Sequence, residues 1–209
     1  VVLKAGPAEA SAAELAVDAS ATASSDGNGV FEPGETSPVA PSWKNVGSGS
    51  FSLSGAAFEF DGPPGATYTT IQGSAEYGTL AAGETARCGT SCYAFFVSDP
   101  ATRPAAHWDA AAKEAPSTAD PPKAWTLHLG DSFADVPRSQ IFYKRIEALL
   151  HSGITSGCGP SIYCPEAAVN RSSMSIFLAK GVAGGGPNIP TDGTVGGRTY
   201  LCATYGISL

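Results

Sequence analysis

The organisation of the chain follows from residues 132–180, which read SFADVPRSQIFYKRIEALLHSGITSGCGPSIYCPEAAVNRSSMSIFLAK. Apolar residues at helical spacing predict a first amphipathic helix over residues 140–152. They are Phe142, Ile146, Leu149 and Leu150. Ser139 is a suitable N-cap, and Gly153 followed by Ile154 is typical of a left-handed helix end.

A second helix is predicted after Asn170, whose side chain can cap it while Val169 and Met174 form a hydrophobic staple. Its buried face is expected to contain Met174, Phe177 and Leu178, and the helix is expected to end near residues 180–181. Between the helices, Cys158 and Cys164 flank a short loop. A disulfide there would stabilise the fold by about 2–3 kcal/mol, because it restricts the unfolded chain.

This stretch resembles one repeat of the S-layer homology family. The matching stretches are residues 133–137, 142–143, 146–149, 153–158, 163–165 and 169–172, together with Met174, Phe177 and Leu178. The resemblance implies a bacterial envelope protein, since tandem repeats of this family bind cell-wall polymers or build surface structures. Arg171 matches the arginine that meets an anionic glycan in wall-binding members, although Asn170 replaces the usual preceding threonine.

A single repeat of this kind has little apolar surface of its own. Its apolar face residues yield on the order of 10–20 kcal/mol if fully buried, whereas ordering roughly 50 residues costs several times as much. Repeats of this size normally bury their faces against neighbours. We therefore expect the unit to dock on the preceding domain, on a further repeat, or on another copy of the protein.

The composition favours a secreted β-protein. The 209 residues include 25 Gly and 16 Pro, which favour strands and turns, and 43% are hydrophobic. The net charge of −7 argues against nucleic acid as a partner. No stretch approaches the roughly 20 apolar residues of a membrane span. The chain starts at Val1 without a visible signal peptide, which predicts a mature, processed product at the cell surface.

Five cysteines indicate an oxidising compartment. Cys88 and Cys92 bracket a three-residue turn, and Cys158 and Cys164 bracket the loop described above, so we predict these two disulfides. Cys202 is left over and is free, intermolecular, or paired with a cysteine elsewhere.

Zinc is the other explanation for closely spaced cysteines. We favour disulfides, because His107, His128 and His151 lie in unrelated sequence contexts. The run His107-Trp108-Asp109 lies within the Pro- and Ala-rich residues 99–124. We interpret it as a tryptophan that anchors a long loop on the domain, rather than as a catalytic group.

Residues 26–35, DGNGVFEPGE, have the composition of a calcium-binding loop. Oxygen ligands would come from the side chains of Asp26, Asn28, Glu32 and Glu35 and from the Val30 carbonyl. The spacing is not that of an EF-hand. The loop resembles one that opens many secreted bacterial β-sandwiches, some of which bind calcium. The alternative is an Asx-rich turn without metal, and in either case the role would be structural.

The remaining pattern predicts a mainly β protein with a small α part. Short alternating segments separated by turns over residues 24–130 predict an immunoglobulin-like or jelly-roll-like β-sandwich. Residues 1–23 are expected to be an N-terminal arm or a strand donated to another subunit. The two-helix unit covers residues 131–181, and residues 182–209 are expected to be an extended C-terminal segment.

We find no motif of a hydrolase or metalloprotease, so the sequence favours a non-enzymatic protein. The leading hypothesis is an extracellular structural protein of the bacterial surface, stabilised by calcium. It would self-assemble into a filament or layer through its N-terminal arm and helical unit. The alternative is a module that anchors a larger exoprotein to cell-wall glycan, with Arg171, Tyr143 and Tyr163 as contacts.

Overall fold

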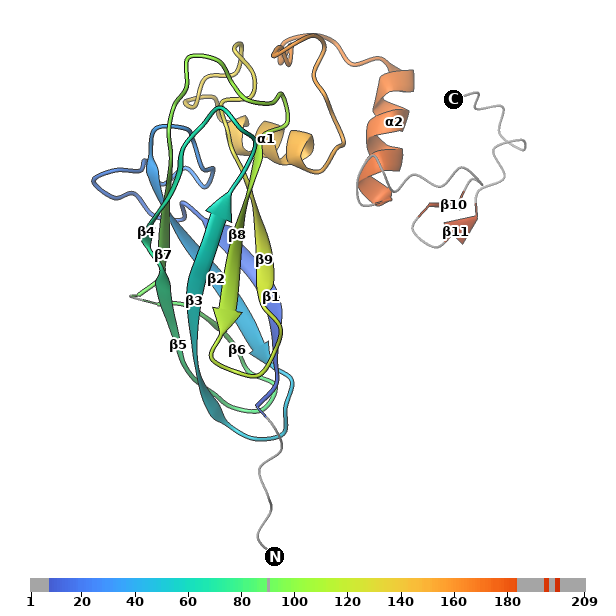
Figure 1. The fold of residues 1–209 in the computed structure, drawn as a ribbon. Helices are drawn as coiled ribbons and strands as arrows, with labels where there is room; N and C mark the ends of the chain where they lie inside the picture. The colour runs from blue at the N-terminus through green and yellow to red at the C-terminus, as the bar shows by residue number, and fades with distance from the viewer. Residues whose placement is uncertain (1–7, 90, 184–193, 196–197, 200–209) are drawn as a thin grey trace, which may run out of the picture. The chain divides into compact units, whose positions relative to one another are not determined.

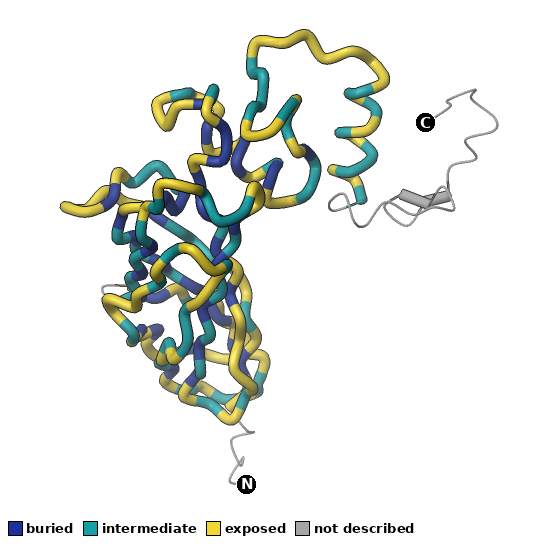
Figure 2. The backbone as a smooth tube through the Cα atoms, turned by 45° about the horizontal axis from the view of Figure 1, so that its top comes forward, coloured by how far each residue is buried: buried dark blue, intermediate teal, exposed yellow. Residues whose placement is uncertain are grey.

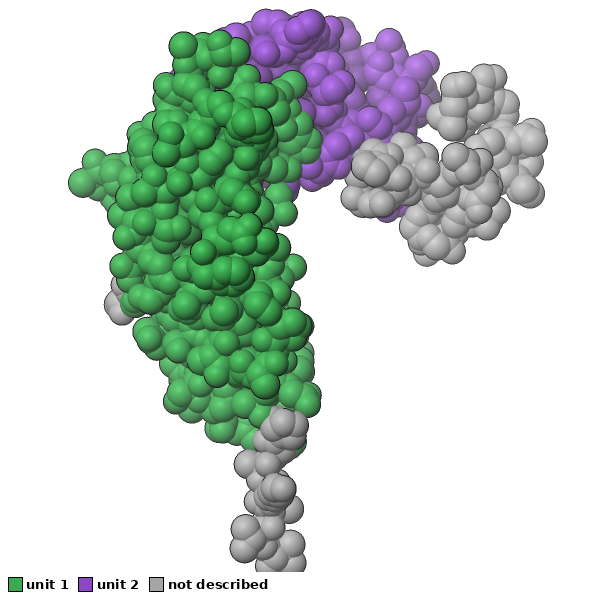
Figure 3. Space-filling view, in the orientation of Figure 1, with its two compact units in different colours: residues 1–130 green, residues 131–209 purple. Residues whose placement is uncertain are grey.

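The computed structural model describes residues 8–89, 91–183, 194–195 and 198–199. The chain divides into two compact units, Val1–Gly130 and Asp131–Leu209, which Figure 3 colours separately. We call them unit 1 and unit 2.

Unit 1 is a β-sandwich built from two antiparallel sheets (Figure 1), which confirms the predicted fold class. The first sheet has the order β1 (Ala10–Val17), β2 (Thr36–Asn45), β7 (Tyr93–Val97), β4 (Tyr68–Gln72), with β6 (Thr85–Arg87) also paired to β2. The second has the order β5 (Ser74–Leu80), β3 (Phe51–Asp61), β8 (Asp109–Pro116), β9 (Lys123–His128).

The sandwich follows from side chains that alternate between core and surface. In β7, Tyr93, Phe95 and Val97 are buried and the residues between them are only half-buried. Strand β8 alternates in the same way. Trp108, just before β8, is 1% exposed and donates its indole N–H to the Tyr68 hydroxyl at 2.8 Å. This contact is the anchoring role predicted for the tryptophan.

The N-terminal stretch contributes to its own sheet. Strand β1 pairs with β2 of the same chain, with Ala10 opposite Asn45 and Val17 opposite Val39. Residues 10–17 of the predicted arm over residues 1–23 are therefore an edge strand of unit 1. The apolar tip at residues 1–3 lies outside the described residues.

A buried carboxylate joins the two sheets. Glu114 on β8 is 1% exposed and accepts four hydrogen bonds. The donors are Trp43 Nε1 at 3.2 Å, Trp125 Nε1 at 2.6 Å, Tyr77 Oη at 2.5 Å and Tyr93 Oη at 2.8 Å. Burial, followed by the charge of Glu114, raises the pKa of both tyrosines, so they remain protonated donors.

Gly55 on β3 makes room for this cluster. A Cβ atom at Gly55 would lie 2.2 Å from Glu114 Oε1 and 2.4 Å from the Tyr93 hydroxyl. Any side chain at this position would therefore displace the buried carboxylate or its donor.

Unit 2 contains α1 (Tyr143–His151), α2 (Arg171–Val182) and the short pair β10 (Thr194–Val195) and β11 (Arg198–Thr199). Helix α1 begins later than predicted. Its N-cap residue is Phe142 and not Ser139, and the Phe142 N–H donates to Gln140 Oε1 at 2.6 Å. The predicted helix end is confirmed, because Gly153 has φ +68° and the Ile154 N–H donates to the Leu149 carbonyl.

The buried face of α1 differs from the predicted one. It consists of Tyr143, Ile146, Glu147 and Leu150. Phe142 is 54% exposed, so its assignment to the buried face was wrong. Phe142 is the N-cap residue and precedes the helix, which begins at Tyr143. The buried face also includes Glu147, a residue type that hydropathy assigns to the surface. Glu147 Oε1 accepts the Ser132 N–H at 3.0 Å, which accounts for its burial.

Helix α2 begins as predicted but packs differently. Asn170 Oδ1 accepts the Ser173 N–H at 2.8 Å, as the capping pattern predicted. No residue of α2 is buried, and Met174 and Leu178 are 44% and 62% exposed. The predicted buried face was therefore wrong, and Figure 2 shows α2 with only exposed and intermediate positions. The helix extends to Val182, and most of residues 182–209 lie outside the described ranges.

Both predicted disulfides are present. Cys88 pairs with Cys92 and Cys158 with Cys164, with Cα–Cα distances of 5.4 Å and 6.0 Å. They fit an oxidising compartment such as the extracellular space. Cys202 lies outside the described residues. Among the helices that the structure describes, none is sufficiently long and apolar to cross a membrane.

Candidate functional site

The loop at residues 26–35 of unit 1 is shaped by glycines and by side chains that bond to nearby backbone. Gly27, Gly29 and Gly34 have φ values of +76°, +83° and +87°. A Cβ atom at Gly27 would lie 2.3 Å from the Ala21 backbone nitrogen, so only glycine fits there. The Asn28 N–H donates to Asp26 Oδ1 at 3.0 Å, and Asn28 Oδ1 accepts the Val30 N–H at 2.8 Å.

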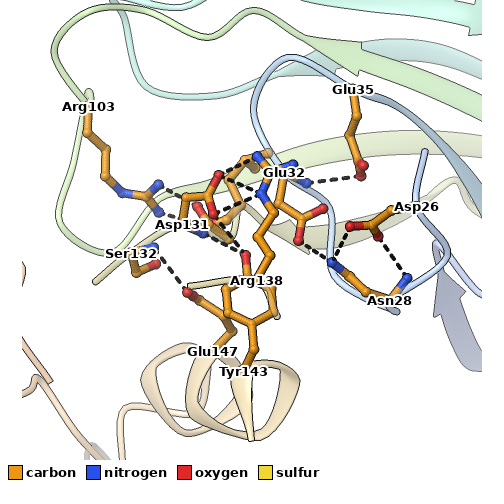
Figure 4. A network of polar contacts seen from close by, with 12 residues as sticks. Asp26, Asn28, Glu32, Glu35, Arg103, Asp131, Ser132, Arg138, Tyr143 and Glu147 are labelled. Carbon is orange, nitrogen blue, oxygen red and sulfur yellow. Dashed lines mark hydrogen bonds and ion pairs between the residues drawn. The ribbon is translucent and has the colours of Figure 1, made fainter. Parts of the chain in front are cut away.

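These turns gather carboxylates at one place. Oxygens of Asp18, Asp26, Glu32 and Glu35 all lie within 4.8 Å of one another. Asp18 and Glu32 are fully buried and Glu35 is 7% exposed. Asn28 Nδ2 donates to Asp26 Oδ2 at 3.1 Å and to Glu32 Oε1 at 2.7 Å, as Figure 4 shows. We call Asp18, Asp26, Glu32 and Glu35 the acidic cluster.

Asp18 is the member that the sequence analysis missed. It directly follows β1 in a left-handed conformation with φ +43°, and its N–H donates to the Pro38 carbonyl at 2.9 Å. Its own carbonyl accepts the Gly29 N–H at 3.0 Å, which holds it against the loop. Its Oδ1 atom is buried and has no hydrogen-bond partner among the described residues. No motif marks this residue, because it is brought to the loop only by the pairing of β1 with β2.

The crowding of carboxylates affects Glu35. Burial, together with the negative charges of Glu32 and Asp18, raises the pKa of Glu35 to about 8, although the Glu32 N–H bond to Glu35 Oε1 acts in the opposite direction. Isolated buried carboxylates are costly unless a cation or a proton neutralises them. A cation or bound protons would offset this cost in the acidic cluster. The candidate ligand atoms are all oxygens, the ligand type that calcium prefers.

The residues considered for glycan binding lie in unit 2. Arg171 is exposed at the start of α2. Tyr163 is half-buried, with its ring 5.3 Å from that of Phe133. Tyr143 is 2% exposed and its hydroxyl accepts the Asp131 N–H at 2.9 Å, so its ring has no face available for a sugar. Asp131 also pairs with Arg138, as Figure 4 shows.

An apolar groove lies between the two helical segments of unit 2. Its volume is about 260 Å³. It is lined by Leu149, Ile154, Thr155, Tyr163, Phe177, Leu178, Gly181 and Val182. Seven of these eight residues are apolar, aromatic or glycine, so the groove suits a hydrophobic ligand or side chain.

The fold and the acidic cluster define a disulfide-containing β-sandwich joined to a small two-helix unit. No protein-family model matches the chain, and the search of curated proteins finds no significant match. The resemblance of unit 2 to an S-layer homology repeat therefore rests on the sequence pattern.

Proposed function

We propose that this chain is a non-enzymatic extracellular structural protein of the bacterial surface, which assembles with copies of itself into a filament or layer. The observation that supports this proposal is the exposed apolar surface of helix α2, in which no residue is buried among the described residues. Its exposed apolar residues are Met174, Ile176, Leu178 and Val182, which are 44%, 44%, 62% and 60% exposed. Valine, leucine, isoleucine and methionine stabilise a protein by about 1.5–3 kcal/mol each when they become fully buried.

The proposed occupant of this surface is the α2 face of a second copy. Leu178 and Val182 belong both to the exposed helix face and to the wall of the groove. Met174, Leu178 and Val182 recur every four residues and lie on one side of α2, whereas Ile176 lies on the other side. In the proposed interface, this side of α2 packs against the same side of α2 in the second copy, as two-fold symmetry requires. Burial of these three partly exposed side chains would contribute on the order of 2–5 kcal/mol per chain. The proposed contribution of the N-terminal arm rests on the apolar sequence at residues 1–3.

Sedimentation velocity and electron microscopy over a range of concentrations test this proposal. We expect concentration-dependent assemblies that shift towards monomer in the double variant Leu178→Ser, Val182→Ser. The matched control is Phe58→Ser, because Phe58 is an exposed apolar residue of unit 1 at 57% exposure. Discrete monomers at all concentrations, with and without calcium, would refute the assembly.

We also propose that the acidic cluster of unit 1 holds a structural calcium ion. Asp18, Asp26, Glu32 and Glu35 would supply carboxylate oxygens, and the sequence adds Asn28 and the Val30 carbonyl. The support is the unpartnered Oδ1 of the fully buried Asp18, together with two further buried carboxylates nearby. Calcium would tie the end of β1 to the loop that leads into β2.

Thermal unfolding with calcium and with a chelator tests the metal proposal. We expect calcium to raise the melting temperature of the parent chain and to have little effect on Asp18→Asn. The control variant is Glu59→Gln, since Glu59 is a carboxylate on β3 that pairs with Lys113 outside the cluster. If calcium raises the melting temperatures of the parent and of Asp18→Asn equally, Asp18 is not a ligand. If calcium leaves the melting temperature of the parent unchanged, the proposed calcium site is refuted.

A second candidate function is attachment to cell-wall glycan. It is favoured by Arg171, which is exposed in the first turn of α2 and forms no ion pair among the described residues. A pull-down on purified wall polymer compares the parent chain with Arg171→Ala. Lys144→Ala is the control, because Lys144 is an exposed cation on α1. Equal retention of the parent and Arg171→Ala would exclude a role for this arginine.

A further inference from the structure

We infer that His107, Asp109 and His128 of unit 1 form a binding site for a divalent transition cation of the zinc type. The sequence places His107 and Asp109 in one run and His128 19 positions after Asp109, and the second sheet brings His128 to them. This inference is independent of the proposed assembly and of the calcium site, because it rests on different residues and a different ligand chemistry.

The sheet sets the positions of all three residues. Asp109 begins β8 and lies directly opposite His128 at the end of β9. Residues directly opposite on an antiparallel pair have side chains on the same face. Ala110, the next residue of β8, is buried, so Asp109 lies on the outer face of the sheet. His107, two residues before Asp109, reaches the same carboxylate. Two imidazoles and one carboxylate therefore share one outer face of the sheet.

The donor atoms converge on a small volume. His107 Nε2 lies 3.2 Å from Asp109 Oδ2, and His128 Nδ1 lies 3.0 Å from Asp109 Oδ1. The two imidazole rings are 5.3 Å apart between centroids and nearly perpendicular. The candidate ligand atoms of these residues all lie within 4.8 Å of one another. Zinc bonds of about 2.0–2.1 Å in tetrahedral geometry place neighbouring ligand atoms about 3.3 Å apart, so only small side-chain rotations are needed.

The donor set selects the class of metal. Neutral imidazole suits zinc, copper and nickel, whereas the acidic cluster offers only oxygen, which suits calcium. To bind zinc, His107 Nε2 and His128 Nδ1 must be unprotonated, and any proton that they carry is released to solvent. Each neutral imidazole then carries its remaining proton on its other ring nitrogen. Three protein ligands leave a fourth position for water or for another donor.

Exposure is compatible with entry of an ion. The side chains of His107 and Asp109 are 40% and 34% exposed, while that of His128 is 9% exposed. The buried side chain of His128 is fixed in position, and an ion can approach through the accessible side chains of His107 and Asp109.

Isothermal titration calorimetry of the chelator-treated full chain with zinc chloride, in excess calcium, tests this inference. Calcium is included so that zinc does not report on the acidic cluster. We expect one equivalent of zinc, with affinity at least tenfold lower in His107→Gln and in His128→Gln. Cobalt(II) serves as a spectroscopic probe, because its visible absorption changes when imidazole replaces water as a ligand.

The controls separate this site from its surroundings. Glu59→Gln and Asp18→Asn are expected to bind zinc as the parent does. Circular dichroism confirms that each variant is folded, and the accessible His107 keeps one informative variant available if His128→Gln unfolds. No zinc binding by the parent chain, or parent-like binding by folded His107→Gln, would overturn the inference.

Discussion

The substitution Glu114→Gln tests whether the buried carboxylate holds the two sheets together. In the native structure, Oε2 accepts the indole N–H groups of Trp43 and Trp125, and Oε1 accepts the hydroxyls of Tyr77 and Tyr93. Glutamine has nearly the same shape but replaces one acceptor oxygen by an NH2 donor. The substitution therefore changes the hydrogen-bond chemistry while the volume stays almost constant.

The expected loss of stability follows from counting the orphaned donors. If the new NH2 faces the indoles, two N–H groups lose their acceptor, since an indole can only donate. If it faces the tyrosines, their oxygens accept but their own protons lose a partner. Each buried donor without a partner costs about 1–3 kcal/mol, so we expect a loss of roughly 2–6 kcal/mol. That is a large share of the roughly 5–15 kcal/mol that stabilises a typical domain.

Urea unfolding followed by tryptophan fluorescence is the assay, because two of the three tryptophans bond directly to Glu114. Glu114→Met, which removes the acceptor from all four donors, should lose more than Glu114→Gln. The variant Glu59→Gln, which removes only a half-exposed ion pair with Lys113, should shift the unfolding midpoint far less. An unfolding free energy of Glu114→Gln equal to that of the parent would show that the acceptor capacity of the carboxylate is not used, and would refute the reasoning.

Three further outcomes are expected. In the metal-free chain, the pKa of Glu35 is raised from 4.5 to about 8, so between these pH values the native state holds a proton that the unfolded state releases. Chemical denaturation should therefore show that the free energy of unfolding falls as pH rises from 4.5 to about 8. Calcium should counteract this fall. In unit 2, hydrogen bonds from the Tyr163 N–H and then the Cys164 N–H lower the pKa of Asp135. This carboxylate therefore contributes stability above its unfolded pKa, and that stability is lost as pH falls through its folded pKa. An NMR titration should find the midpoint of Asp135 below that of a model aspartate, and Asp135→Asn should abolish this pH-dependent contribution to stability. Asn170→Ala removes the N-cap of α2 and should destabilise the helix by about 1 kcal/mol, seen as lower helicity by circular dichroism, whereas Ser156→Ala outside the helices should not.

Features that depend on neighbours in sequence were predicted well. The Asn170 cap, the left-handed Gly153, the two disulfides and the alternation of the strands each arise from residues a few positions apart. The glycine-rich loop at residues 26–35 was also recognised, because its turns require residues that tolerate positive φ.

Features that depend on distant residues were missed or misassigned. Hydropathy assigned Phe142 and Met174 to buried faces, but burial depends on which surface packs against the helix, and both residues are exposed. No sequence pattern predicts the burial of Glu147 and Glu114, which depends on hydrogen bonds from distant donors. A carboxylate can enter a core only where the fold supplies such donors.

The sequence by itself determined the local structure of this protein: the sandwich strands and turns, the helix caps and the short disulfide loops, because each depends on backbone preferences and periodicity over a few residues. Only the tertiary structure decided which side chains meet. Strand pairing brought Asp18 to the loop at residues 26–35 and placed His128 opposite Asp109, and contacts across the core gathered four donors around Glu114. Such groupings join residues separated by tens of positions, and no local pattern records the pairing that brings them together.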